Sequence, residues 1–205
     1  MGLFDFFKRK DKGEPEKPLV KPNNLGEFNL QLADFSEKIH RSEVLADAWI
    51  NPNFDPEFEA AIAHLRTGTP MKKGDIIELK TYIINILLWE HKVELTFDLD
   101  NASKNINEFV QKINKQLNWI IKSKSLIDEA IISKLLQLKN DSWLDEDQQP
   151  VTKEDFIKSM QLISIDFASN AAFDLYFDDG DLFYGHTIIV NVNSKREIKN
   201  ASIAG

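Results

Sequence analysis

The segment 174–190, DLYFDDGDLFYGHTIIV, holds the residues of this chain that are best suited to chemistry. The carboxylates of Asp178, Asp179 and Asp181 could bind a hard cation such as Mg²⁺ or Mn²⁺, because these ions prefer oxygen ligands. His186 follows closely, and an imidazole changes its charge near neutral pH, which makes it the candidate catalytic residue. One interpretation is therefore a metal-dependent hydrolase centred on these four residues.

The same segment has a purely structural interpretation. Asp-Gly at 179–180 is a common signal for a short hairpin turn, because both residues tolerate positive φ angles. Apolar residues alternate on both sides of it: Phe173, Leu175 and Phe177 before, Ile188, Val190 and Val192 after. Such a turn needs neither a metal nor a cofactor.

His186 is the least expected residue of this hairpin. Strand alternation places it on the same face as Leu182, Tyr184 and Ile188, which we expect to be buried. A buried imidazole without a hydrogen-bond partner costs about 1–3 kcal/mol. The sequence leaves two alternatives open, a satisfied structural histidine and a functional one.

Common catalytic motifs are missing. The chain has no phosphate-binding glycine loop, no nucleophile elbow, no His-Glu-x-x-His and no EF-hand pattern. It has no cysteine, which excludes disulfides, thiolate zinc sites and thiol nucleophiles. These absences favour a protein that is not an enzyme and binds no cofactor.

The charge is uneven. The chain has a net charge of −8, whereas residues 141–181 hold eleven acidic residues and two lysines. Such a surface repels nucleic acid and attracts a basic partner. The leading interpretation is therefore a protein-interaction module that binds a basic protein, for example an immunity-type inhibitor of a basic toxin. The candidate partner-binding residues are Asp145, Glu146, Asp147, Asp179, Asp181 and Tyr184.

The hydrophobic pattern predicts an α+β fold. A strand hairpin is expected over 80–99, with His91 at its exposed turn, and a meander of antiparallel strands over 160–204. Two long helices, about 103–122 and 126–139, are expected to pack on one face of this antiparallel sheet. Ser125 is predicted to cap the second of them and Thr152 to cap a short third helix.

The first 77 residues are expected to be separate from this α+β domain. Residues 1–24 indicate a flexible tail and linker, and residues 25–77 a helical region with helices near 31–48 and 55–68. The aromatic and basic residues 1–10 are predicted to give at most weak membrane contact. No apolar run approaches the length of a membrane span, and no secretory signal is seen, which fits a cytoplasmic protein.

The motif FDDGDLFYGHTIIV and the terminal ASIAG resemble a bacterial family known as domain of unknown function 2262. The order of VELTFDLD, the helices and the segment LQLKNDSWLDEDQQPVTKEDF also resembles that family, over about residues 78–205. The family pattern has Asp-Leu-Phe-Trp-Gly-His where this chain has 181–186, with Tyr184 in place of tryptophan. The resemblance implies a bacterial protein and an α+β domain, and it implies no particular reaction.

Overall fold

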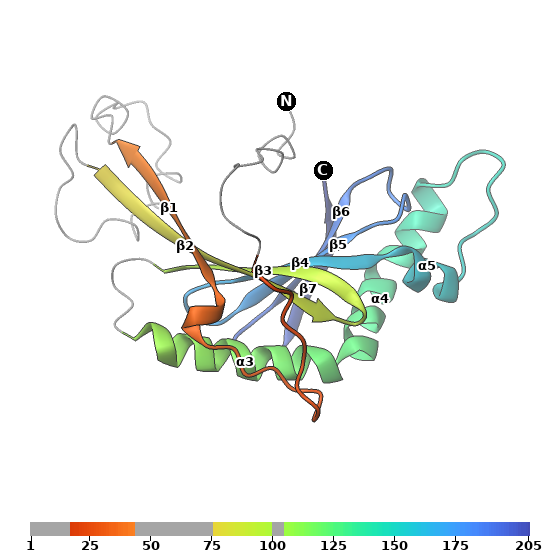
Figure 1. The fold of residues 1–205 in the computed structure, drawn as a ribbon. Helices are drawn as coiled ribbons and strands as arrows, with labels where there is room; N and C mark the ends of the chain where they lie inside the picture. Colours follow the sequence, from red (N-terminus) through yellow and green to blue (C-terminus); the bar gives the residue numbers. More distant parts are fainter. Residues whose placement is uncertain (1–16, 44–75, 100–104) are drawn as a thin grey trace.

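A computed structural model of the chain describes residues 17–43, 76–99 and 105–205 (Figure 1). In these ranges no helix is long and apolar enough to cross a membrane. The described segments form an α+β fold, a seven-stranded sheet with three α-helices, as the sequence predicts.

The strands follow one another across the sheet in chain order, β1 to β7. Their bounds are Ser36–Glu43 (β1), Ile76–Leu88 (β2), His91–Leu99 (β3), Gln161–Phe167 (β4), Phe173–Asp178 (β5), Thr187–Val192 (β6) and Ile198–Ala204 (β7). The β2–β3 hairpin, with His91 exposed next to its turn, and the β4–β7 meander are confirmed.

One pairing differs from the predicted antiparallel sheet. β3 and β4 run parallel, with Leu95 opposite Ile165, so the sheet is mixed. Parallel neighbours need a long crossover connection, and here the helices between residues 106 and 159 supply it.

The prediction of a helix near 31–48 is wrong over its described part. A short 3₁₀ turn at Leu32–Asp34 leads into β1, which pairs with β2. The free edge of the long strand β2 offers this charged segment a ladder of backbone hydrogen bonds, and Val20 uses the same edge further along, beside Ile86. Residues 36–43, and Val20 through its single bridge, therefore belong to the same sheet as the rest. The helix predicted at 55–68 lies outside the described residues.

Helix α3 (Ile106–Lys122) buries the apolar stripe that the sequence predicts. Helix α4 (Lys124–Ser142) begins two residues after α3 ends. The predicted cap at Ser125 is wrong, because α4 begins at Lys124, two residues before the predicted start, and Ser123 precedes it. The short helix α5 (Lys153–Ser159) begins at the predicted cap, Thr152.

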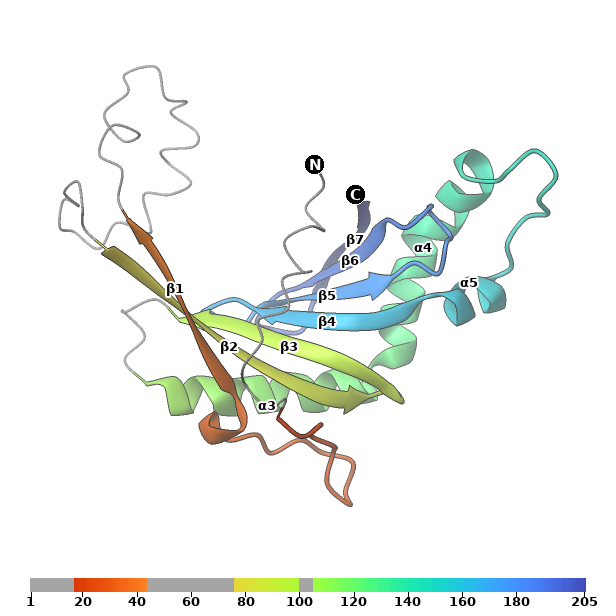
Figure 2. The ribbon, with the colours of Figure 1, turned by 45° about the horizontal axis from the view of Figure 1, so that its top comes forward.

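The helices meet the sheet at different places. Phe109 of α3 packs edge-on against Phe97 of β3, and α4 packs against β7 (Figure 2). The finer expectation, that both long helices pack on one face, stays a prediction.

Two asparagines of α3 hold an extended N-terminal segment. The Asn114 side chain accepts from the backbone N–H of Leu30 and donates to its carbonyl, at 2.8 and 2.9 Å. Asn118, one turn later, makes the same pair of bonds with Phe28. Phe28 and Leu30 are both buried, so these amides satisfy backbone groups that water does not reach.

We expect Asn114→Ala to destabilise the fold by about 2–4 kcal/mol, because it leaves two buried backbone groups of Leu30 without partners. Urea unfolding measures the free energy of unfolding. The matched control, Asn107→Ala at an exposed position of the same helix, should change it by less than about 0.5 kcal/mol. Equal losses in both variants would contradict this role of Asn114.

A polar row crosses one face of the sheet. Thr96, Asp166, Asp174 and Asn191 are neighbours on successive strands. Thr96 donates to Asp166 and Asn191 donates to Asp174, both at 2.8 Å. Partial burial raises the pKa of Asp166 above its ordinary value of 3.8; the carboxylates of Asp98 and Asp174 raise it further, against the Thr96 hydrogen bond.

A raised pKa in the folded protein means that ionisation of Asp166 opposes folding as the pH rises. Asp166→Asn should therefore stabilise the protein at neutral pH, by less than about 1 kcal/mol for this partly exposed group. The advantage should vanish below the ordinary pKa of 3.8, where the unfolded chain is also protonated. Urea unfolding over a pH series measures this, and a gain that does not depend on pH would contradict it. The control is Asp147→Asn in an exposed loop, where we expect no gain.

Candidate functional site

The segment between β5 and β6 is a longer loop than the predicted two-residue turn. β5 ends at Asp178 and β6 begins at Thr187, so residues 179–186 form the connection, here called the 179–186 loop. The predicted alternation of Leu182, Tyr184 and His186 on one buried face is wrong. Leu182 and Phe183 are both buried, and Tyr184 is exposed, because the chain turns here instead of extending.

Asp179 shapes this loop. The residue is only 2% exposed, and its carboxylate accepts the backbone N–H groups of Asp181 and Phe183, at 3.2 and 2.6 Å. Asp178 accepts the N–H of Gly180 at 2.8 Å in the same manner. These are typical turn-forming bonds of aspartate. Asp179 is therefore a structural residue and not part of an exposed partner-binding surface.

The metal hypothesis receives no support from the structure. Among the residues described, no group of three or more histidine, aspartate or glutamate side chains could hold a metal ion. Asp178, Asp179, Asp181 and His186 are close in sequence, but the two bonded carboxylates are turned toward the loop backbone.

His186 has a structural partner. Its Nδ1 lies 2.5 Å from the carbonyl oxygen of Phe183, which can only accept, so Nδ1 is the donor. The ring packs edge-on against Trp143, with the ring centres 5.1 Å apart. This bond and this contact explain the half-buried histidine without a catalytic role.

Trp143 is the centre of the site, and the sequence interpretation missed it. It follows the end of α4 and contacts Phe183 and Tyr184 as well as His186, with ring centres 5.5 and 5.7 Å away. The signal in the sequence was a tryptophan directly before an acidic loop. No local sequence pattern indicates that Trp143 contacts the 179–186 loop, which lies some forty residues later in the chain.

Tyr184 is exposed and yet held in place. Its side chain is 57% exposed, and its hydroxyl donates to Asp145 at 2.9 Å, with the carbonyl of Trp143 at 3.4 Å. The Nζ atom of the buried Lys139 donates to that carbonyl at 2.6 Å and lies 5.6 Å from the centre of the tyrosine ring. The hydrogen bond to Asp145 raises the pKa of Tyr184; desolvation and the negative charge of Asp145 add to this.

Four of the predicted partner-binding residues thus lie on two adjoining loops. Tyr184 bonds to Asp145, and the exposed Glu146 and Asp147 follow in the same acidic loop. We call these four residues the Tyr184 surface. Asp181 is exposed elsewhere in the 179–186 loop, and Asp179 is buried beneath it.

The model of a family described as "Uncharacterized protein conserved in bacteria (DUF2262)" matches residues 77–203. The chain belongs to this family. The match confirms the resemblance seen in the sequence. No curated protein and no solved structure matches the chain. In this DUF2262 protein the matched region contains Trp143, the acidic loop and the whole 179–186 loop, whereas β1 and the segment held by α3 lie outside it.

Two glycines of the 179–186 loop give a matched test of its geometry. Both Gly180 and Gly185 have positive φ, at 57° and 84°. A Cβ atom on Gly180 would collide with the carbonyl of Ser159, whereas one on Gly185 would meet open space. Gly180→Ala should therefore destabilise this DUF2262 protein by more than about 3 kcal/mol, and Gly185→Ala by about 1 kcal/mol, the strain alone. Thermal unfolding compares them, and equal losses would contradict the close approach at Gly180.

Proposed function

We propose that this protein is a non-enzymatic interaction module that binds a basic protein through the Tyr184 surface. The observation that carries the proposal is the bond between the exposed Tyr184 and Asp145, two residues far apart in sequence.

The tyrosine has the properties of a binding anchor. Tyrosine is enriched among the residues that dominate binding energy at protein interfaces, because it offers a large ring and a polar tip. An exposed side chain usually loses rotamer freedom when it binds. Here Trp143, Lys139 and Asp145 already restrict the ring, so less freedom remains to be lost.

The surrounding charge gives the class of partner. Asp145, Glu146 and Asp147 lie in the segment 141–181, with its nine net negative charges. Acidic side chains next to an aromatic anchor favour lysine- or arginine-rich surfaces and disfavour phosphate backbones. An immunity-type inhibitor of a basic toxin is one protein of this kind.

The double variant Glu146→Gln/Asp147→Asn tests the charge. We expect a tagged protein to retain a basic partner from extracts of its native cells at about 50 mM salt, and to lose it at about 500 mM, where screening is strong. The double variant should retain at least about fivefold less. The control Glu90→Gln/Glu108→Gln removes the same charge at exposed positions elsewhere and should retain as much as the unmodified protein.

Tyr184→Ala tests the anchor. It removes the ring and leaves the three acidic residues, so it should weaken retention at about 50 mM salt by about tenfold or more. The proposal is wrong if no partner is retained at low salt, if the retained protein is acidic, or if both double variants behave alike.

A further inference from the structure

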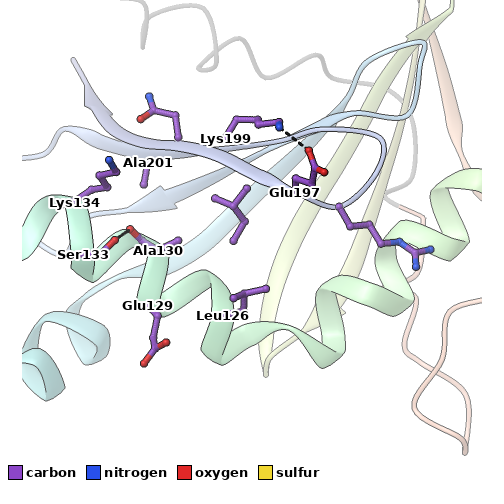
Figure 3. Close-up of a pocket in the computed structure, with 11 residues that line it drawn as sticks. Leu126, Glu129, Ala130, Ser133, Lys134, Glu197, Lys199 and Ala201 are labelled. Carbon is purple, nitrogen blue, oxygen red and sulfur yellow. Dashed lines mark hydrogen bonds and ion pairs between the residues drawn. The ribbon is translucent and has the colours of Figure 1, made fainter.

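A groove separates α4 from the edge strand β7, away from the Tyr184 surface. Its volume is about 560 Å³, within the range of known ligand sites. Its walls are Leu126, Glu129, Ala130, Ser133 and Lys134 of α4 and the consecutive residues 196–201, which comprise the end of the β6–β7 turn and the start of β7 (Figure 3).

The strand wall has free backbone groups. Among the described strands β7 is the last of the sheet and pairs only with β6. Alternate N–H and C=O groups of an edge strand point away from its neighbour and are open to pairing. An extended peptide can pair with such an edge, and a groove beside it then accepts alternate side chains of the peptide.

This edge is held firmly to the rest of the fold. Gln116 of α3 donates to the carbonyls of Ala171 and Ser194 and accepts from Nε of Arg196, which also donates to the carbonyl of Lys115. The bonds to Ser194 and Arg196 fix the turn between β6 and β7, and the bond to Ala171 connects it through α3 to the turn between β4 and β5. Because the start of the edge strand is already fixed, it loses little conformational entropy when a ligand binds.

The charge of the groove is opposite to that of the protein as a whole. Lys134 makes no ion pair with any described residue. The two acidic residues of the wall are already paired, Glu129 with Lys153 and Glu197 with Lys199, and Figure 3 shows Glu129 pointing away from β7. Lys134 is therefore available for a carboxylate.

The remaining wall is apolar. Leu126 is 53% exposed, an unusual position for a leucine, and Ala130, Ile198 and Ala201 continue the small apolar surface. We propose that the groove binds an extended acidic peptide segment of another protein, which adds to β7 as a further edge strand. Its apolar side chains contact Leu126 and Ile198, and one of its carboxylates pairs with Lys134.

A second copy of this chain fits the groove less well. It would bring Lys199 of its own β7, with Arg196 and Glu197 of the preceding turn, beside the same three residues of the first copy, so that a net positive charge would face a net positive charge. Like charges that face each other across paired strands are destabilising. The charge pattern therefore favours an acidic peptide over a second copy.

The test uses a labelled probe peptide of about six residues, in which aspartate alternates with valine. We expect it to bind the full chain with a Kd below about 1 mM and to shift the amide NMR signals of β7. Lys134→Glu should weaken binding by about fivefold or more. The matched control, Lys112→Glu on the exposed side of α3, should stay within about twofold.

Two further probes separate strand addition from simple charge attraction. The same peptide with alternate backbone N-methyl groups cannot complete the ladder and should not bind, and a peptide that alternates lysine with valine should not bind either. The proposal is overturned if the acidic probe fails to bind, if N-methylation has no effect, or if Lys112→Glu weakens binding as much as Lys134→Glu. It is also overturned if sedimentation shows a dimer in which β7 amides are protected, because a second copy then occupies the groove.

Discussion

The parallel pairing of β3 and β4 is the constraint on which the rest of the structure depends. Two parallel neighbours cannot be joined by a tight turn, so the chain must cross from one end of the sheet to the other between them. Helices α3, α4 and α5 form this crossover. Its path places α3 where Asn114 and Asn118 hold the N-terminal segment, and α4 beside β7. It also brings the loop after α4 to the loop between β5 and β6, where the Tyr184 surface forms.

Within that frame, a few buried polar groups fix the loops. Asp179 holds the 179–186 loop by two backbone N–H groups, and Gln116 holds the β4–β5 turn by the carbonyl of Ala171 and the β6–β7 turn by the carbonyl of Ser194. A buried carboxylate or amide with these bonds satisfied costs little, whereas the same group without them costs several kcal/mol. These polar residues therefore specify one loop conformation each.

The sequence predicted the elements whose pattern is local. The stripe of α3, the cap at Thr152, the β2–β3 hairpin and the β4–β7 meander all depend on neighbours in sequence.

Prediction from the sequence failed where the partner of a residue is distant in the chain. The charged segment around Ile39 suggested a helix, and the edge of β2 made it a strand. Asp-Gly marked the correct place for a turn, but Leu182 and Phe183 resemble strand residues and are in fact buried within the loop. Trp143 could not be connected to Tyr184 because no local pattern reports a contact across forty residues.

Helix α4 links the two proposed surfaces physically. Its first three turns supply Leu126 and Lys134 to the groove, and its last turn supplies Lys139 to the support of Tyr184. Lys139 donates to the carbonyl of Trp143, just past the end of the helix, where a cation also interacts favourably with the helix dipole. The same ammonium group thus ends the helix, fixes Trp143 and lies over the tyrosine ring. One helix thus carries both the side chains of the groove wall and the lysine that supports Tyr184, which fixes the positions of the two surfaces relative to each other.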